Sequence, residues 1–292
     1  MSHKDGEKAL FGPGGNSEDF YRAGYRSTKE APSFLASIGL DAYEFEAGNG
    51  LRATDATLFE IGAAARAHGI AMSLHTPYYI SLSGTDPEKR LKSIDYIEQS
   101  LHAAELLSAK TIVVHTGSAA KISREEAMNL VRDTLARTLE RVDTRGILIG
   151  LETMGKRNQL GTLDEVIELC TMDKRLVPVV DFGHMNAREC GGVFETVDDY
   201  RYVFDRIGSR LGDDVARYLH CHFSKIEWTA AGEKKHLTFE DTVYGPHFEP
   251  LAECLVRESL CPTVICESDG TMSRDALQMK NEYERIKRSW KN

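Results

Sequence analysis

The chain has 292 residues, 41% of them hydrophobic, and its 45 acidic and 36 basic residues give a net charge of −9. This length suits two ordinary domains or one α/β barrel of about 250 residues. Because no Pro-, Gly- or Ser-rich linker divides the chain, we expect one domain over residues 1–292. The acidic balance does not indicate a nucleic-acid-binding protein, although bound divalent metals and a local basic face would not show in a whole-chain sum.

No part of the chain approaches the run of about 20 apolar residues that spans a bilayer. The N-terminal stretch "MSHKDGEKALFGPGG" lacks the apolar segment of a signal peptide. We therefore expect a soluble, cytoplasmic protein without membrane contact, and we expect a monomer. The six cysteines contain no CxxC pair, so we expect reduced core residues rather than a disulfide framework.

Short β-favouring runs, each ending near a polar residue, alternate with longer segments of helical spacing. The runs cover residues 8–15, 41–48, 69–76, 111–117, 146–153, 177–184, 216–224 and 262–269. Between them, segments such as 91–109, 123–142 and 162–170 repeat apolar residues every three or four positions. These eight units predict an α/β fold of the (β/α)8 TIM-barrel type. An open doubly wound sheet is the alternative, but "FGPGGN" near the N-terminus is not the GxGxxG nucleotide turn.

The stretch "LVPVVDFGH" ends a continuous apolar run, Leu176 to Val180, with Asp181 and, three positions later, His184. Such a run without alternation is typical of a strand covered on both faces, as in a parallel sheet wrapped by helices. Asp181 then either caps the next helix or serves as a ligand at the mouth of a barrel.

The other strand ends favour the ligand. Six successive runs end in an imidazole or a carboxylate: His75, His115, Glu152, Asp181, His220 or His222, and Glu267. In a TIM barrel these ends converge on one mouth. Carboxylates packed together without Lys or Arg repel and raise one another's pKa. Divalent cations would neutralise them, and mixed nitrogen and oxygen ligands suit zinc or manganese, so the sequence predicts a multi-metal site.

Five short motifs around these residues stand in a characteristic order: "SLHTPYYISL", "VVHTGS", "GLETMG", "VVDFGH" and "VICESD". In these motifs the chain resembles the endonuclease IV family, TIM-barrel apurinic/apyrimidinic endonucleases with a trinuclear zinc site. The resemblance extends from about residue 70 to about residue 270. It implies two or three zinc ions, with manganese or magnesium as alternatives, and hydrolysis of the DNA backbone 5′ to abasic sites in base-excision repair.

The resemblance also assigns ligands to three ions. One ion would be bound by His75, His115 and Glu152. A second would be bound by Glu152 as a bridging carboxylate, Asp181, His220 and Glu267. A third would be bound by His184 and by a pair from the loop after the seventh strand, here Glu233 and His236.

The chain departs from the family pattern at two places. Where the family has His followed by an Asn-Asp pair, this chain reads "HCHFSK"; counting back from Lys225 selects His220, and His222 is either a replacement ligand or a supporting group. Glu233 and His236 are separated by two residues rather than by the one of the family's Asp-x-His pair. Side chains three apart do not share a face of a regular strand, so we expect the third ion to be bound most weakly.

Two functions are compatible with these residues. In a nuclease, Glu152 and Glu267 would serve the catalytic metals, Tyr78 and Tyr79 would press against the duplex beside a flipped abasic sugar, and Arg52 would reach the minor groove.

The alternative is a single-metal sugar isomerase or epimerase of the related xylose-isomerase-like barrels, in which Glu152 and Glu267 would shuttle protons. The acidic balance suits a small neutral substrate. However, a one-metal isomerase does not need His75, His115 and His184, and these residues favour the nuclease.

Overall fold

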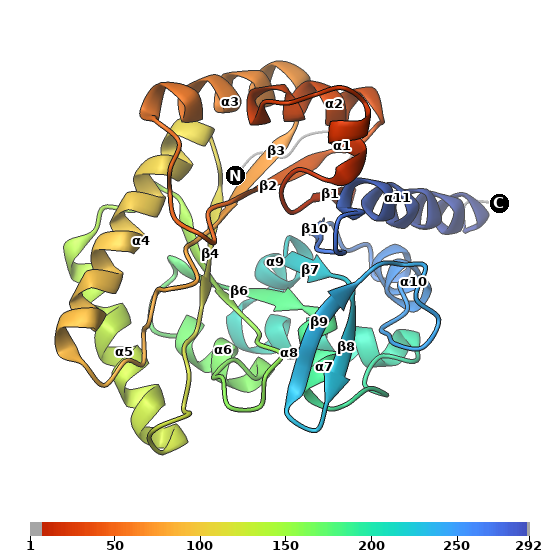
Figure 1. The fold of residues 1–292 in the computed structure, drawn as a ribbon. Helices are drawn as coiled ribbons and strands as arrows, with labels where there is room; N and C mark the ends of the chain where they lie inside the picture. The colour runs from red at the N-terminus through yellow and green to blue at the C-terminus, as the bar shows by residue number, and fades with distance from the viewer. Residues whose placement is uncertain (1–7, 291–292) are drawn as a thin grey trace.

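A ring of parallel strands surrounded by helices makes up the computed structural model, which describes residues 8–290 (Figure 1). The strands form one parallel sheet in the order β1-β10-β7-β6-β5-β4-β3-β2. Their bounds are β1 (Leu10–Pro13), β2 (Ala42–Glu46), β3 (Ala71–His75), β4 (Thr111–His115), β5 (Leu148–Glu152), β6 (Leu176–Asp181), β7 (His220–Phe223) and β10 (Thr263–Cys266). All eight lie within the runs that the sequence predicts, apart from one residue at the start of β6.

Backbone hydrogen bonds between β1 and β2 close the sheet. The N–H of Gly15 donates to the carbonyl of Glu44 at 3.0 Å, and the N–H of Asp41 donates to the carbonyl of Phe11 at 2.9 Å. Gly12 permits this approach, since a Cβ there would lie 1.8 Å from the carbonyl oxygen of Ala42. The fold is therefore the TIM barrel that the sequence predicts.

Helices cover the outside of the barrel (Figure 1). Their bounds are α1 (Glu18–Arg22), the 3-10 turn η1 (Thr28–Glu30), α2 (Ala31–Ser37), α3 (Asp55–His68), α4 (Pro87–Leu107), α5 (Arg124–Arg141), α6 (Leu163–Cys170), α7 (Phe182–Arg188), α8 (Val197–Leu211), α9 (Asp213–Arg217), α10 (Glu249–Arg257) and α11 (Met272–Ser289). Side-chain caps mark the starts of several helices: the Asp86 carboxylate caps α4, and Thr162 with Glu165 forms a capping box at α6.

A two-stranded antiparallel hairpin, β8 (Lys225–Thr229) and β9 (Gly232–Leu237), follows β7. It lies at the front of the view in Figure 1. The sequence analysis expected only a loop in this region. Because the hairpin begins directly after a strand of the barrel, it stands at the end where the carboxyl termini of the strands meet.

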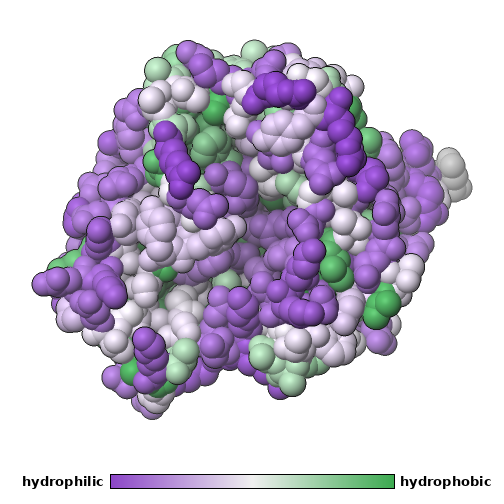
Figure 2. Space-filling view, viewed as in Figure 1, coloured by the Kyte–Doolittle hydropathy of each residue, from purple (hydrophilic) through white to green (hydrophobic). Residues whose placement is uncertain are grey.

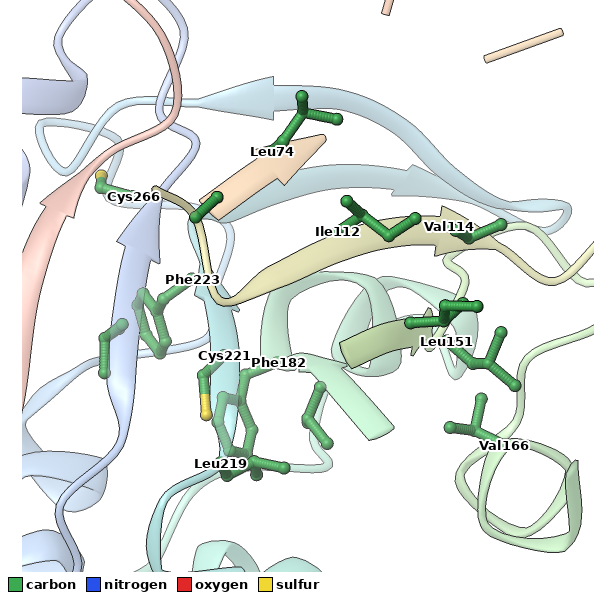
Figure 3. Close-up of a cluster of buried hydrophobic side chains, with 14 of the residues drawn as sticks. Leu74, Ile112, Val114, Leu151, Val166, Phe182, Leu219, Cys221, Phe223 and Cys266 are labelled. Carbon is green, nitrogen blue, oxygen red and sulfur yellow. The ribbon is translucent and has the colours of Figure 1, made fainter. Parts of the chain in front are cut away.

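Strand alternation decides which side chains reach the barrel interior. Leu74, Ile112 and Val114 belong to the buried hydrophobic layer between strands and helices (Figure 3). The next residues along β3 and β4, His75 and His115, therefore point inward. In the other strands, too, alternate side chains point into the barrel.

Among the described residues, no helix is long and apolar enough to cross a membrane. All six cysteines are free. Four of them are buried and two, Cys190 and Cys261, are partly exposed, so the expectation of reduced cysteines fits, and the core holds four of the six.

Candidate metal centre

The first group of candidate ligands lies at the carboxyl ends of β3, β4 and β5. Nε2 of His75 lies 3.5 Å, and Nε2 of His115 3.1 Å, from Oε2 of Glu152. Two ligands bound tetrahedrally to zinc at about 2.0–2.1 Å are separated by roughly 3.3 Å. The three side chains are therefore spaced as ligands that share one ion, in the set that the sequence predicts.

The second group shares Glu152 with the first. It consists of Glu152, Asp181, His222 and Glu267, whose candidate ligand atoms all lie within 4.8 Å of one another. Nδ1 of His222 lies 3.1 Å from Oε1 of Glu152 and 3.4 Å from Oε1 of Glu267. Because Oε2 of Glu152 faces the first group and Oε1 faces the second, this carboxylate is placed to bridge two ions.

The structure corrects one position in this group: His222 lies there, and His220 does not. In the register of β6 and β7, Asp181 pairs with His222, whereas Val179 pairs with His220. His220 points into the same barrel but lies one layer deeper, where its Nε2 is 2.9 Å from Oε2 of Glu44. Counting back from Lys225 fails because this lysine already begins the hairpin strand β8.

The third group combines His184 with the hairpin residues Glu233 and His236. Nε2 of His184 lies 3.6 Å from Oε2 of Glu233. A β-bulge brings the two hairpin side chains to the same face: Trp228 pairs with Glu233 and Glu227 pairs with Lys235, so Lys234 is the extra residue. The spacing argument for a weakly bound third ion therefore loses its basis, because the strand absorbs the additional residue.

Asp181 caps a helix, and its other oxygen is placed for the ligand role that the sequence also allows. Its Oδ1 accepts the backbone N–H of His184 at 2.7 Å and so caps α7. Its Oδ2, like Oε2 of Glu152, is buried and accepts no well-aligned hydrogen bond from any residue in 8–290. The two oxygens contact imidazole nitrogens of His115 and His184 at 3.1 and 3.2 Å without the alignment of a hydrogen bond. Buried carboxylate oxygens without hydrogen bonds are costly, and bound cations would remove the cost. The residues present therefore fit a metal centre, and the mixed donors suit zinc or manganese.

The side chains of the centre form a network of buried opposite charges. Burial raises the pKa of Asp181 to about 7, with the charges of Glu267 and Glu152 adding to burial and His184 opposing it. Burial also acts on Glu152, but the imidazoles around it, led by His115, outweigh burial and hold its pKa well below the usual range. The imidazoles must be neutral to bind metal, so metal uptake releases protons.

Arg188 connects α7, which carries His184, to the neighbouring loop over residues 154–159. The buried guanidinium of Arg188, at the end of α7, donates to the carbonyls of Met154, Lys156, Arg157 and Gln159 at 2.7–3.1 Å. This loop holds the hairpin in turn, because the carbonyl of Gly155 accepts the N–H of Glu233 at 3.0 Å. His184 and Glu233 are thus fixed relative to each other by backbone contacts.

The three residues predicted to bind substrate differ in whether they contact a candidate metal ligand. Tyr78 is 56% exposed, and its ring stacks on His115 with centroids 5.3 Å apart. Tyr79 is 50% exposed and packs instead on Tyr96. The exposed Arg52 lines a hollow that it shares with Tyr78 and Glu46. Only Tyr78 therefore touches a candidate metal ligand.

Sequence reasoning missed two carboxylates, Glu44 and Glu46, on the inner face of β2. Their candidate ligand atoms and those of Glu267 lie within 4.8 Å of one another. The Glu46 side chain is exposed at the mouth, and partial desolvation by its neighbours raises its pKa, with His75 opposing and Glu44 adding to the rise. The signal was present in "DAYEFEAG", where two carboxylates alternate along a strand that should be apolar on its inner face.

Hydrophilic side chains surround a hollow near the centre of the molecular face drawn in Figure 2. The view is that of Figure 1, with the hairpin β8–β9 beside the hollow. The polar groups described above come from strands and loops on opposite sides of the barrel, so the mouth offers a charged rather than an apolar surface to a substrate.

Comparison with known proteins gives the same fold and two kinds of relative. An uncharacterized protein of Methanocaldococcus jannaschii is 29% identical over 221 residues, which is 74% of this chain and 78% of that protein. A protein of Mycoplasma pneumoniae named "Probable endonuclease 4" is 30% identical over 171 residues, 56% of each chain. A second protein with this name, from Shouchella clausii, is 27% identical over 217 residues, 72% of each chain.

Among solved structures, a D-tagatose 3-epimerase-like protein matches with a TM-score of 0.69 and 20% identity over 89% of this chain and 94% of that one. Endonuclease IV from Thermus thermophilus matches with a TM-score of 0.62 and 18% identity over 90% and 93%. At such identities these structures show the fold alone. Residues 32–286, which contain seven of the eight barrel strands and all three ligand groups, match the family described as xylose isomerase-like TIM barrel, and the chain belongs to this family.

Proposed function

We propose that this protein is a metal-dependent phosphodiesterase that hydrolyses the DNA backbone 5′ to abasic sites, with zinc as its metal. The observation that carries the proposal is the third ligand group, His184 with Glu233 and His236, beside two groups joined by Glu152. One ion is enough for sugar isomerisation, whereas clustered ions suit phosphate ester hydrolysis, in which attacking and leaving oxygens both need stabilisation. The relatives named endonuclease 4 support the same activity.

Bound ions would polarise the phosphate and supply a nucleophile from water near neutral pH. The protein's own contribution is placement. Glu152 would fix the separation of two ions, since each of its oxygens belongs to a different group. Glu267, whose Oε1 lies 3.4 Å from Nδ1 of His222, would be a further ligand of the second ion. Tyr78, stacked on His115 with half of its surface exposed, offers an apolar face beside the centre for an unpaired sugar or base. Tyr79 would press against the duplex, and Arg52 would reach the minor groove.

A specific observation favours a second candidate, a sugar epimerase. The quartet Glu152, Asp181, His222 and Glu267 is by itself a one-metal site, and Glu46 adds a carboxylate at the mouth within 4.8 Å of Glu267. Extra negative charge disfavours a phosphodiester anion and is tolerated by a neutral sugar. In this alternative Glu152 and Glu267 would transfer protons to and from the substrate carbon.

The decisive experiment measures zinc content and cleavage on the same preparation. We expect three zinc ions per chain and incision of a duplex carrying one tetrahydrofuran abasic analogue, with the undamaged duplex left intact. His236→Gln should lose one ion and most of the incision, whereas His68→Gln, an exposed imidazole on α3, should change neither. One ion per chain, with epimerisation of a ketohexose and no incision, would establish the alternative instead.

A further inference from the structure

Glu44 lies directly beneath the candidate metal centre and is 0% exposed. Its Oε2 accepts hydrogen bonds from Oγ of Ser73 at 2.7 Å and from Nε2 of His220 at 2.9 Å. Its Oε1 lies 2.9 Å from Nε2 of His222, close enough for an ion pair but not aligned as a hydrogen bond, and neither atom has another hydrogen-bond partner among residues 8–290. This carboxylate therefore touches one candidate ligand from below and is itself held on its other oxygen.

Three other candidate ligands have one ring nitrogen held by a neutral oxygen. Nδ1 of His75 lies 3.0 Å from the carbonyl of Thr76, and Nδ1 of His184 lies 3.0 Å from the carbonyl of Thr153. Nδ1 of His184 also lies 3.2 Å from Oδ2 of Asp181, but its hydrogen bond is to the carbonyl. Nδ1 of His236 lies 2.9 Å from Oγ of Ser224. In each of these three rings, Nε2 is left to face the ion.

His222 is arranged the other way round. Its Nδ1 faces Glu152 and Glu267, and its Nε2 faces the carboxylate of Glu44. A neutral imidazole carries a proton on one nitrogen only. Carboxylates lie beside both nitrogens, but Glu152 and Glu267 would face a bound ion. Glu44 is then the carboxylate left to accept the ring proton on Nε2, and the lone pair of Nδ1 is directed toward the second ligand group.

We propose that Glu44 is a positioning residue of the metal centre, which fixes the tautomer and orientation of His222 so that Nδ1 binds the second ion. The inference rests on the proposed function only in requiring a metal at this group. Glu44, His220 and His222 also lie close enough together to share an ion; in this proposal His220 and Ser73 instead hold Glu44 in place through hydrogen bonds to its Oε2. Partners of this kind behind a metal-bound histidine orient the ring, and their loss typically costs about 10–100-fold in metal affinity.

The first test uses the unmodified protein. Long-range proton–nitrogen correlation spectra of histidine-labelled, zinc-loaded protein report which ring nitrogen carries the proton. We expect His222 to be protonated at Nε2, and His75, His184 and His236 to be protonated at Nδ1. His222 bound through Nε2, with the proton on Nδ1, would overturn the proposal.

The second test measures metal affinity in variants. Glu44→Gln keeps the shape and removes the charge, and it should lose one ion per chain at a chelator concentration about 10–100-fold below that required for the unmodified protein. Ser73→Ala should shift the loss in the same direction by less. The matched control is Asp275→Asn, a buried carboxylate that holds the backbone N–H of Phe239; it should lower the melting temperature and leave all ions bound.

The outcomes separate this inference from the proposed function. If Glu44→Gln is folded and retains every ion through the same chelator series as the unmodified protein, Glu44 has only a structural role. If the unmodified protein binds three ions and does not incise abasic DNA, the proposed function fails while the inference on Glu44 stands, because neither of its readouts depends on catalysis.

Discussion

Replacing Gly155 by alanine should remove the third ion without changing any of its ligands. A Cβ at this position would lie 2.6 Å from Cβ of Glu233 and 3.0 Å from Cδ2 of His184. Carbon atoms in good contact are separated by about 3.5–4.0 Å, so Glu233 would have to move by roughly 1 Å. Metal–ligand distances in working sites vary by only about 0.2 Å. We therefore expect the affinity of the third ion to fall by about 10–100-fold, with an overpacking cost to stability of about 1–3 kcal/mol.

The assay is stepwise dialysis against a weak chelator, with zinc counted at each step and the unfolding of the metal-free protein measured in parallel. Gly208→Ala is the matched control. It adds the same methyl group within α8, where the nearest atom outside the helix backbone is Oδ1 of Asp213 at 3.2 Å, and it should stabilise the helix by about 0.5–1 kcal/mol. If Gly155→Ala holds three ions through the same dialysis as the unmodified protein, the hairpin does not depend on this contact and the reasoning is refuted.

Three further predictions follow from the ligand groups and from one helix cap. Glu152→Gln should leave one zinc ion per chain by elemental analysis, because two groups share this carboxylate; retention of all ions would contradict the bridge. His222→Gln should lose an ion in native mass spectrometry and His220→Gln should not, and the reverse result would restore the choice made from sequence. Burial raises the pKa of Glu165, but the hydrogen bonds from Arg124 and the α6 cap outweigh burial and lower it below 4.5. The stability that this carboxylate contributes is therefore present above its unfolded pKa of about 4.3 and is lost as the pH falls through its folded pKa. In urea unfolding between about pH 3 and 6, Glu165→Gln should make the free energy of unfolding depend less on pH. An unchanged dependence on pH would refute this assignment.

Strand positions and most strand-end ligands could be predicted from the sequence because both depend on local rules. An apolar run that ends in His75, His115 or Glu152 fixes the strand and the residue at its mouth together. In a parallel barrel, all such ends meet regardless of their separation along the chain. The convergence of these three side chains therefore required no knowledge of the intervening helices.

The structure departs from the sequence predictions where pairing between strands decides which side chains lie together. His220 and His222 share one face of β7, so only the register with β6 reveals which of them stands level with Asp181. The bulge at Lys234 depends likewise on how β9 pairs with β8. Register and bulges depend on how strands pair and cannot be seen in one segment of sequence. The spacing of Glu233 and His236 alone places their side chains on opposite faces of a strand, and the bulge brings them to the same face.

Glu44 was missed for a different reason. A strand with glutamates at alternate positions, as in β2, reads as half-exposed, and a TIM barrel has no exposed strand face. This contradiction was itself evidence of a polar network in the barrel interior. It becomes interpretable only when Ser73 and His220 are seen on either side of the carboxylate.

The order of the ligands along the chain has a consequence for assembly. The first group is complete once residue 152 has been synthesised, because its members come from the neighbouring strands β3, β4 and β5. The third group is complete at residue 236, whereas the second requires Glu267, after the last strand of the barrel. Since domains are synthesised from their N-terminal end, Glu152 joins a ligand group that is complete early in synthesis to one that needs the last strand of the barrel. A product truncated before β10 would lack Glu267, and with it the complete second group.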